Sequence, residues 1–296
     1  MNIPKYWAKA EQTIAIGRQT FHFVAWKGSD ESLQDAQRQA QVALADRIAR
    51  KERGEKLGQY PKDGAPLREE VLEQIFNPSG ERIAVITRNA AGCLVLNTAR
   101  VMFVDLDFAN QYPTLRAAAK SFWEAVGGMF RRPTKAVKTQ TPQDQLLEQV
   151  RNWHSQHPDW AMRVYRTRAG LRLLVAHDVF DPTSALVQQA MRELGADMRY
   201  MRLCQAQSCF RARLTPKPWR LKGGRMERPP VRFPWASAQE EALQRQWERT
   251  YQGRIGNFAV CTLLANLGHS PVHPDAEQIL LLHDQYTLSQ SDKPLA

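Results

Sequence analysis

The segment Val101-Met102-Phe103-Val104-Asp105-Leu106-Asp107-Phe108 carries the clearest indication of fold and chemistry in this chain of 296 residues. Its apolar run is typical of a buried β-strand. Along a strand, the side chains of residues i and i+2 point to the same face, so the carboxylates of Asp105 and Asp107 should project together at the strand end. Two neighbouring carboxylates repel each other, and each raises the pKa of the other unless a cation lies between them.

A divalent cation is the partner that we expect for this pair of acids. Mg²⁺ and Mn²⁺ prefer hard oxygen ligands, and two such ions can stabilise the attacking and leaving oxygens of a phosphoryl transfer. Asp105 and Asp107 are therefore the candidate metal ligands and the candidate catalytic residues. The alternative is that both carboxylates are solvated at the strand end or pair with nearby arginines.

Short apolar segments separated by turn residues flank this strand on both sides. Asn89, Gly92 and the Ala169-Gly170 pair separate neighbouring segments closely enough for antiparallel hairpins. The sequence predicts further strands at Phe21–Trp26, Ile83–Thr87, Cys93–Leu96, Arg163–Thr167, Leu171–Ala176, Met198–Cys204 and Ser208–Thr215. It predicts helices at Leu33–Arg53, Leu67–Phe76, Leu115–Val126, Gln145–Ser155, Thr183–Leu194, Ala238–Thr250, Asn257–Leu267 and Asp275–Tyr286.

This order of elements predicts an α+β protein. Hairpins interrupted by helices favour a largely antiparallel sheet over a doubly wound parallel one. We expect an α+β core domain at residues 1–235 and a helical C-terminal part at residues 236–296. The chain has no G-x-G-x-x-G after a strand and no G-x-x-x-x-G-K-[ST], which argues against a Rossmann cofactor site and P-loop ATP hydrolysis.

The chain is basic, and its charge is concentrated. It contains 41 Lys and Arg against 30 Asp and Glu, a formal net charge of +11. Residues 201–232 hold nine basic residues and one acid, Glu227, so this segment carries eight of those eleven charges. Trp219, Phe233 and Trp235 lie in or beside it and can stack on nucleobases. The segment is typical of a nucleic-acid or polyphosphate contact, with a solvated surface loop as the alternative.

Two predicted hairpins supply candidate phosphate-binding residues, because planar guanidinium groups bind phosphate through two parallel hydrogen bonds. In the first hairpin, Arg166 and Arg168 share a strand face beside a glycine turn. In the second, Arg211 and Arg213 share a face, and the basic loop after them extends the positive field. The complete candidate set is Arg166, Arg168, Arg172, Arg211, Arg213, Lys217, Trp219 and Arg220.

Composition argues against several other classes of site. The four cysteines form no C-x-x-C pair, which argues against a zinc ribbon, and we expect them to be reduced and mostly buried. No apolar stretch approaches the roughly 20 residues that span a bilayer, and no secretory signal is recognisable at the N-terminus. We therefore expect a cytoplasmic protein without a membrane span.

The run Phe103-Val104-Asp105-Leu106-Asp107 and the basic strand–turn–strand that follows it resemble the catalytic palm of archaeo-eukaryotic-type primases and primase-polymerases. In that superfamily an apolar run precedes D-x-D or D-x-E, and a later hairpin carries S-x-H. The hairpin here reads Thr167-Arg168-Ala169-Gly170-Leu171-Arg172 and has no histidine. The position of the family's third acid corresponds to Asp197. The resemblance covers Ile83–Leu214 and implies an RRM-like core that handles nucleotides or nucleic acid.

Three hypotheses follow. The first is a primase-like protein that binds nucleic acid or nucleotides and uses Mg²⁺ or Mn²⁺ for nucleotidyl transfer, phosphoryl transfer or phosphodiester cleavage. The second is a non-catalytic nucleic-acid-binding protein that uses the same basic face. The third is an adaptor whose basic segment binds an acidic protein partner.

Overall fold

The computed structural model describes residues 1–55, 67–108, 140–221 and 226–296. The predicted helix at Leu115–Val126 lies outside these residues. Within them the α+β class is confirmed, because helices alternate with three sheets whose strands all pair antiparallel. The strands are thus divided over several sheets instead of forming one.

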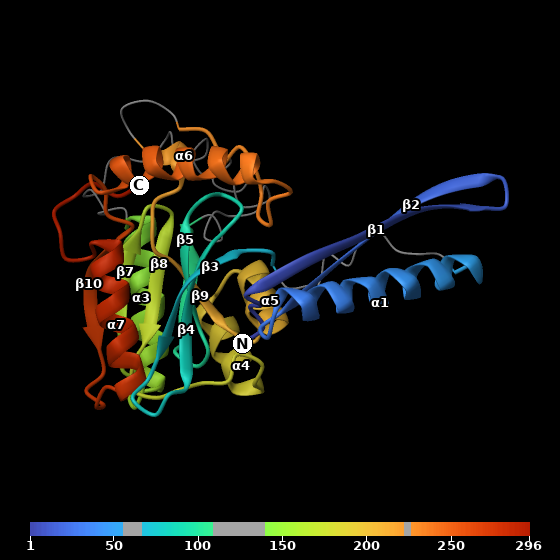
Figure 1. The fold of residues 1–296 in the computed structure, drawn as a ribbon. Helices are drawn as coiled ribbons and strands as arrows, with labels where there is room; N and C mark the ends of the chain where they lie inside the picture. Colours follow the sequence, from blue (N-terminus) through green and yellow to red (C-terminus); the bar gives the residue numbers. More distant parts are fainter. Residues whose placement is uncertain (56–66, 109–139, 222–225) are drawn as a thin grey trace, which may run out of the picture.

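Two four-stranded sheets form the body of the molecule (Figure 1). The first has the strand order β10-β7-β8-β6, and the second has the order β3-β4-β5-β9. The bounds in the first sheet are β10 Cys261–Leu267, β7 Met162–Thr167, β8 Gly170–Val175 and β6 Phe103–Asp107. Those in the second are β3 Glu70–Phe76, β4 Arg82–Arg88, β5 Leu94–Thr98 and β9 Phe210–Arg213.

Helices pack around the two sheets. Helix α6 runs across one end of the body, and α4 lies at the opposite end (Figure 1). A single apolar cluster joins both sheets and includes Phe103 and Leu106 of β6 as well as Leu96 of β5. The helices of the body are α3 Pro142–Gln156, α4 Ala185–Leu194, α5 Met198–Gln207, α6 Ala238–Ile255 and α7 Pro274–Thr287, and a 3-10 turn spans Pro218–Arg220.

Strands β6 and β9 are edge strands of different sheets, and side chains join them. The hydroxyl of Tyr200 donates to the carbonyl of Phe103 on β6 at 2.9 Å and accepts from the amide of Arg211 on β9 at 3.3 Å. The guanidinium of Arg172, on β8, donates to the carbonyl of Arg213 on β9 at 2.9 Å. We call this junction the seam. Both β9 residues come from the basic segment, so the fold brings that segment to the end of β6.

The N-terminal part forms an arm that projects from the body (Figure 1). It consists of the antiparallel strands β1 (Tyr6–Ile16) and β2 (Gln19–Ser29), with α1 (Leu33–Glu52) packed on one face. The arm has apolar clusters of its own, one of which pairs Ala8 with Ala36. The predictions for Phe21–Trp26 and Leu33–Arg53 are confirmed. Strand β1 was not predicted, because its small and polar residues lack the apolar alternation of a typical strand.

Three predicted elements are wrong. Leu67–Phe76 has helical spacing of its apolar residues, but Glu70–Phe76 is an edge strand with a bulge, and Phe76 is half exposed. Met198–Cys204 is part of helix α5 instead of a strand, because Asp197 caps its first turn. Asn257–Leu267 was predicted as a helix, yet Cys261–Leu267 is strand β10, paired with β7 through a bulge at Leu264. The region after residue 236 therefore contributes a strand to the same sheet as β6.

Strands β6 and β8 approach each other closely at Gly170. A Cβ atom at this position would lie 1.7 Å from the carbonyl oxygen of Leu106. We therefore expect Gly170→Ala to force the two strands apart and to lower the free energy of unfolding by about 1–3 kcal/mol. Urea denaturation measures the change.

Gly253, in helix α6, supplies the matched control. Nothing lies within 4 Å of a Cβ placed there, so Gly253→Ala should stabilise the protein by about 0.5–1 kcal/mol through the lower entropy of the unfolded chain. Equal unfolding midpoints for the two variants would contradict the close approach at Gly170.

Candidate functional site

Asp105 has a cationic partner inside the protein. Asp105 on β6 and Arg172 on β8 lie directly opposite each other in the strand register. The Arg172 side chain donates from Nε to Oδ1 of Asp105 at 2.8 Å and from Nη2 to Oδ2 at 3.3 Å. Arg172 is 1% exposed, so it cannot contact phosphate as predicted from the sequence. The sequence left three possibilities for the acid pair: a divalent cation, solvation, or pairing with an arginine. In the structure, Asp105 pairs with an arginine.

The surroundings of Arg172 keep it charged. Burial by itself lowers the pKa of this guanidinium, but the charge and hydrogen bonds of Asp105 outweigh burial and raise the pKa above its ordinary value. Nη1 of Arg172 also lies 3.5 Å from Nε2 of His283 on α7. Burial lowers the pKa of His283 to about 4, so this imidazole is neutral at pH 7. The buried guanidinium of Arg172 therefore contacts the charged carboxylate of Asp105 and the neutral imidazole of His283.

Asp107 differs from Asp105. It makes no hydrogen bond or ion pair with the described part of the chain, and its pKa is raised by burial and by the charges of Asp105 and Asp197. Asp197, the candidate third acid, is the N-cap of α5, and its carboxylate accepts a hydrogen bond of 2.7 Å from the amide of Arg199. The Asp197 side chain therefore caps its own helix, while its negative charge contributes to the raised pKa of Asp107.

These residues fit a divalent ion poorly. Within the described residues, no group of three His, Cys, Asp or Glu side chains is arranged to hold a metal ion. Both carboxylate oxygens of Asp105 are already bonded to Arg172. The Mg²⁺ or Mn²⁺ site at Asp105 and Asp107 stays a prediction, and we derive no chemical step through it.

A group of cations without acidic partners lies next to Asp107. The group consists of Arg213, Lys217 and Arg220, and in the described part of the chain none of the three forms an ion pair with a carboxylate. Nε of Arg213 is buried and has no hydrogen-bond partner there. Burial lowers the pKa of all three, and their mutual repulsion lowers the pKa of Lys217 and Arg220 further. Arg168, at the β7–β8 turn, adds to the repulsion on Arg220.

We call Arg168, Arg213, Lys217 and Arg220 the unpaired cluster. Paired arginines elsewhere in the chain show the opposite effect: carboxylates raise the pKa of Arg245, as they do for Arg172. None of the described carboxylates forms an ion pair with the cluster. The charges of Asp107 and Asp105 offset only part of the effect of burial on the pKa of Lys217, Arg220 and Arg213. Such a site favours an anion.

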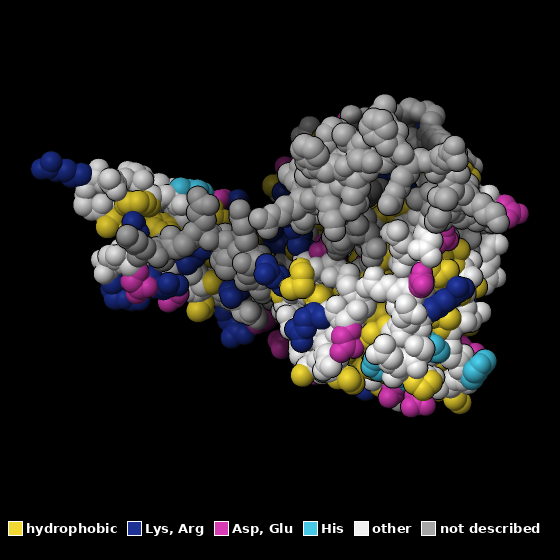
Figure 2. Space-filling model, turned by 180° about the vertical axis from the view of Figure 1, so that it is seen from behind, with side chains coloured by type: hydrophobic (Ala, Val, Ile, Leu, Met, Phe, Trp, Pro, Cys, Tyr) yellow, Lys and Arg dark blue, Asp and Glu magenta, His cyan; other side chains and the backbone are white. Residues whose placement is uncertain are grey.

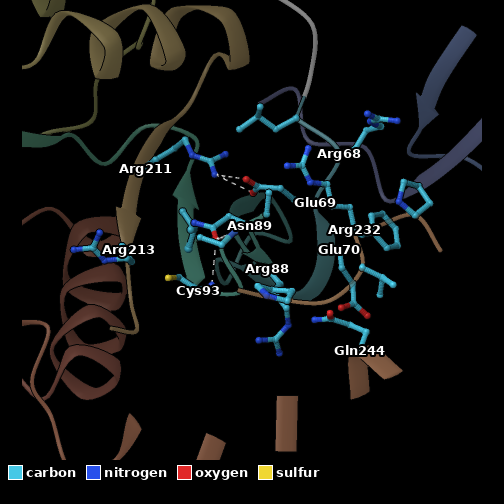
Figure 3. A pocket seen from close by; sticks show the side chains of 18 of the residues that line it. Arg68, Glu69, Glu70, Arg88, Asn89, Cys93, Arg211, Arg213, Arg232 and Gln244 are labelled. Atoms are coloured by element: carbon cyan, nitrogen blue, oxygen red, sulfur yellow. Dashed lines mark hydrogen bonds and ion pairs between the residues drawn. The ribbon is translucent and has the colours of Figure 1, made fainter. Parts of the chain in front are cut away.

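Other residues predicted from the sequence have structural roles. Arg211 donates two hydrogen bonds of 2.8 and 2.9 Å to Glu69, and Figure 3 shows it directed at this carboxylate, apart from Arg213. The Arg211 side chain is 7% exposed, so it is not available to a ligand. Arg166 donates to the side chain of Gln143. In this structure Arg211 is therefore engaged by Glu69 and Arg166 by Gln143, and their phosphate contacts stay predictions.

Trp219 lies beside the cluster. The Nζ atom of Lys217 is 5.7 Å and the guanidinium carbon of Arg228 is 4.9 Å from the centroid of the Trp219 ring. The ring thus contacts cations from two parts of the basic segment. This position agrees with the sequence-based grouping of Trp219 with Lys217 and Arg220.

A cleft of about 800 Å³ opens at the seam. Its lining includes three kinds of side chain: cations such as Arg213 and Lys217, the aromatic rings of Trp26 and Trp235, and the acids Asp105, Glu69 and Glu70. Arg68 lies over the ring of Trp26 at 4.4 Å, and Arg245 lies over the ring of Trp235 at 4.7 Å. The cleft therefore combines cations with aromatic rings that are already stacked on guanidinium groups. Figure 3 shows part of its lining.

Sequence reasoning missed the contributions of Trp26 and Arg68. Trp26 belongs to the arm, and Arg68 precedes β3, far from the basic segment in sequence. Nothing in the local pattern of either residue indicates that it faces a cleft. The prediction of aromatic side chains near the basic segment did include Trp235.

The arm is a weaker candidate for an anion site. Figure 2 shows basic and acidic side chains interspersed along it. Several of its cations form ion pairs with its own acids, such as Lys9 with Glu11 at 2.8 Å and Arg50 with Glu55 at 2.7 Å. The cleft, in contrast, is lined by Arg213 and Lys217 of the unpaired cluster.

The cysteines offer no reactive site. All four are free and buried, as predicted. Burial raises the pKa of Cys204 to about 12 and that of Cys209 and Cys261 to about 11, so these thiols stay protonated at pH 7. Among the described helices, none combines the length and apolarity needed to cross a membrane.

The two acids of β6 should respond oppositely to neutralisation. The folded-state pKa of Asp107 lies above its ordinary value, so the ionised carboxylate opposes folding at any pH above that pKa. We expect Asp107→Asn to raise Tm at pH 7, with a gain that shrinks as the pH falls through the raised pKa of Asp107. Scanning calorimetry in metal-free buffer over a pH series measures this.

Asp105→Asn is the matched comparison. This substitution leaves Arg172 buried without a counter-charge, so we expect a loss of about 3–5 kcal/mol in the free energy of unfolding. If both substitutions destabilise the protein equally at pH 7, the two acids share a cation, and the distinction between them is wrong.

Comparison with known proteins adds no relative from which a function could be inferred. No family model, no curated protein and no solved structure matches the chain. The resemblance to primases therefore rests on the Phe103–Asp107 motif and the order of elements. The residues of the cleft are therefore the basis of the function proposed below.

Proposed function

We propose that the chain binds nucleic acid or nucleotides at the seam, in and beside the cleft. Arg213 and Lys217 of the cleft lining, with the neighbouring Arg168 and Arg220, would hold the phosphate groups. The observation that carries this proposal is the grouping of Arg213, Lys217 and Arg220 without a carboxylate partner among the described residues. Buried like charges destabilise a protein unless an anion balances them. A phosphate supplies that charge and accepts several hydrogen bonds from guanidinium and ammonium groups.

The aromatic part of the cleft supports a nucleotide over a bare inorganic anion. Trp26 and Trp235 both line the cleft, and a guanidinium group already lies over each ring. Nucleobases stack on such rings with little dependence on sequence. A ligand with an anionic end and a planar end matches the cations and the aromatic rings of the lining.

The relation to archaeo-eukaryotic-type primases is part of this proposal. The apolar run ending in Asp105 and Asp107 lies on strand β6, and the predicted hairpin forms β7 and β8. The hairpin has no histidine of the S-x-H motif, and its Arg172 pairs with Asp105. This pairing favours the non-catalytic alternative, in which the chain binds nucleic acid without metal-dependent transfer.

Removing cations of the cluster should weaken nucleic-acid binding. We expect Lys217→Ala/Arg220→Ala to lose roughly tenfold in affinity per phosphate contact removed. The slope of log K against log salt should fall by about 0.7 per contact on a single strand. Fluorescence anisotropy with single-stranded DNA and RNA, and competition by ATP, measure the loss and distinguish nucleic acid from free nucleotide.

Arg151→Ala/Arg192→Ala is the matched control. Both residues are exposed, lie on α3 and α4, and do not line the cleft. Equal losses of affinity for the two double variants would reject the cleft as the binding site. Equal affinity for a polyglutamate of matched charge would favour an adaptor for an acidic protein partner.

A further inference from the structure

Asp105 and Asp107 lie close together on β6, and their charges repel each other. Arg172 on the neighbouring strand β8 provides a positive charge for Asp105. Asp105 is paired across the β6–β8 ladder with Arg172, and the close approach at Gly170 keeps the two strands at short distance. Both hydrogen bonds of the pair join the same two groups, Nε with Oδ1 and Nη2 with Oδ2. This side-by-side geometry leaves neither carboxylate oxygen of Asp105 without a bonded partner.

The guanidinium is fixed on its other side as well. Nη1 of Arg172 donates to the carbonyl oxygen of Arg213 at 2.9 Å, and the ring of His283 lies beyond it at 3.5 Å. Arg172 is 1% exposed, so water cannot replace these contacts if the side chain moves. A divalent ion that took both oxygens of Asp105 would compete with Arg172 for the one carboxylate that this buried cation contacts among the described residues.

We propose that Arg172 is a resident counter-cation that takes the place of a divalent metal at Asp105, so that the cleft binds phosphate groups without metal. The inference rests on the proposed function for its ligand, but its central claim concerns Asp105 and can be tested without any nucleotide. Arg172 also positions Arg213, because it holds the backbone of that residue at the edge of the unpaired cluster. It acts through Asp105 and Arg213 and is a positioning residue.

The first test uses Mn²⁺ alone. Electron paramagnetic resonance of free Mn²⁺ during titration with the wild-type protein should show no stoichiometric site that depends on Asp105. In Arg172→Gln the carboxylate of Asp105 loses its counter-charge, and a Mn²⁺ site at Asp105 and Asp107 should appear. The double variant Arg172→Gln/Asp105→Asn should lose it again.

Two outcomes of this titration overturn the proposal. One is a stoichiometric Mn²⁺ site in the wild-type protein that disappears in Asp105→Asn. The other is a folded Arg172→Gln variant, verified by circular dichroism, that gains no Mn²⁺ site. If Arg172→Gln fails to fold, the wild-type titration and the experiment below decide.

The second test measures binding of a single-stranded oligonucleotide to the wild-type protein in EDTA and in Mn²⁺, at matched ionic strength. We expect affinities that agree within about twofold, whereas a metal bridge between Asp105 and phosphate would make EDTA abolish binding. Loss of binding in EDTA therefore overturns the proposal. If no oligonucleotide binds in either buffer, the proposed function fails, and the Mn²⁺ titration still tests the role of Arg172.

Discussion

The ion pair between the buried Arg172 and the partly exposed Asp105 joins the elements on which the fold and the site both depend. Arg172 lies on β8, its partner lies on β6, and its third hydrogen bond reaches the backbone of Arg213 on β9. Strands β6 and β9 belong to different sheets, so no strand ladder holds them together. Leaving a buried charge unpaired costs about 3–5 kcal/mol, which is a large part of the stability of most domains. The side chains at the seam therefore hold the two sheets in the position that forms the cleft.

The basic residues of the chain divide into two groups that sequence alone could not separate. Arg211 and Arg213 are two residues apart on one strand and were predicted to act together. Arg211 meets Glu69, which lies 142 residues away in the chain, and Arg213 meets no carboxylate among the described residues. Composition could predict a polyanionic partner and the segment involved. It could not predict which cations the fold neutralises, because their acidic partners come from distant segments.

Strands with an unbroken local pattern of apolar residues were predicted well, and strands with bulges were not. Strand β6 is an edge strand, but its pairing with β8 contains no bulge and its apolar residues are buried. A tight turn closes the β7–β8 hairpin, so both segments carry a local pattern that the fold retains. Strands β3 and β10 lie at sheet edges and contain bulges, so one side of each is exposed and the alternation of apolar residues is broken. The position of Trp26 at the cleft depends on how the arm meets the body, and no local pattern encodes that contact.

Charged residues at the seam fall into two groups, one in an ion pair that stabilises the fold and one without ion pairs to any described residue. The ion pair of Asp105 stabilises the fold, whereas the pKa values of Asp107, Arg213, Lys217 and Arg220 are shifted toward the neutral forms. Such shifts mean that the folded protein without an anion is less stable than it would be with neutral groups at these positions. A bound anion reverses part of that cost by mass action, since a ligand stabilises the state that binds it. The proposed phosphate ligand would therefore stabilise the folded chain through these cations.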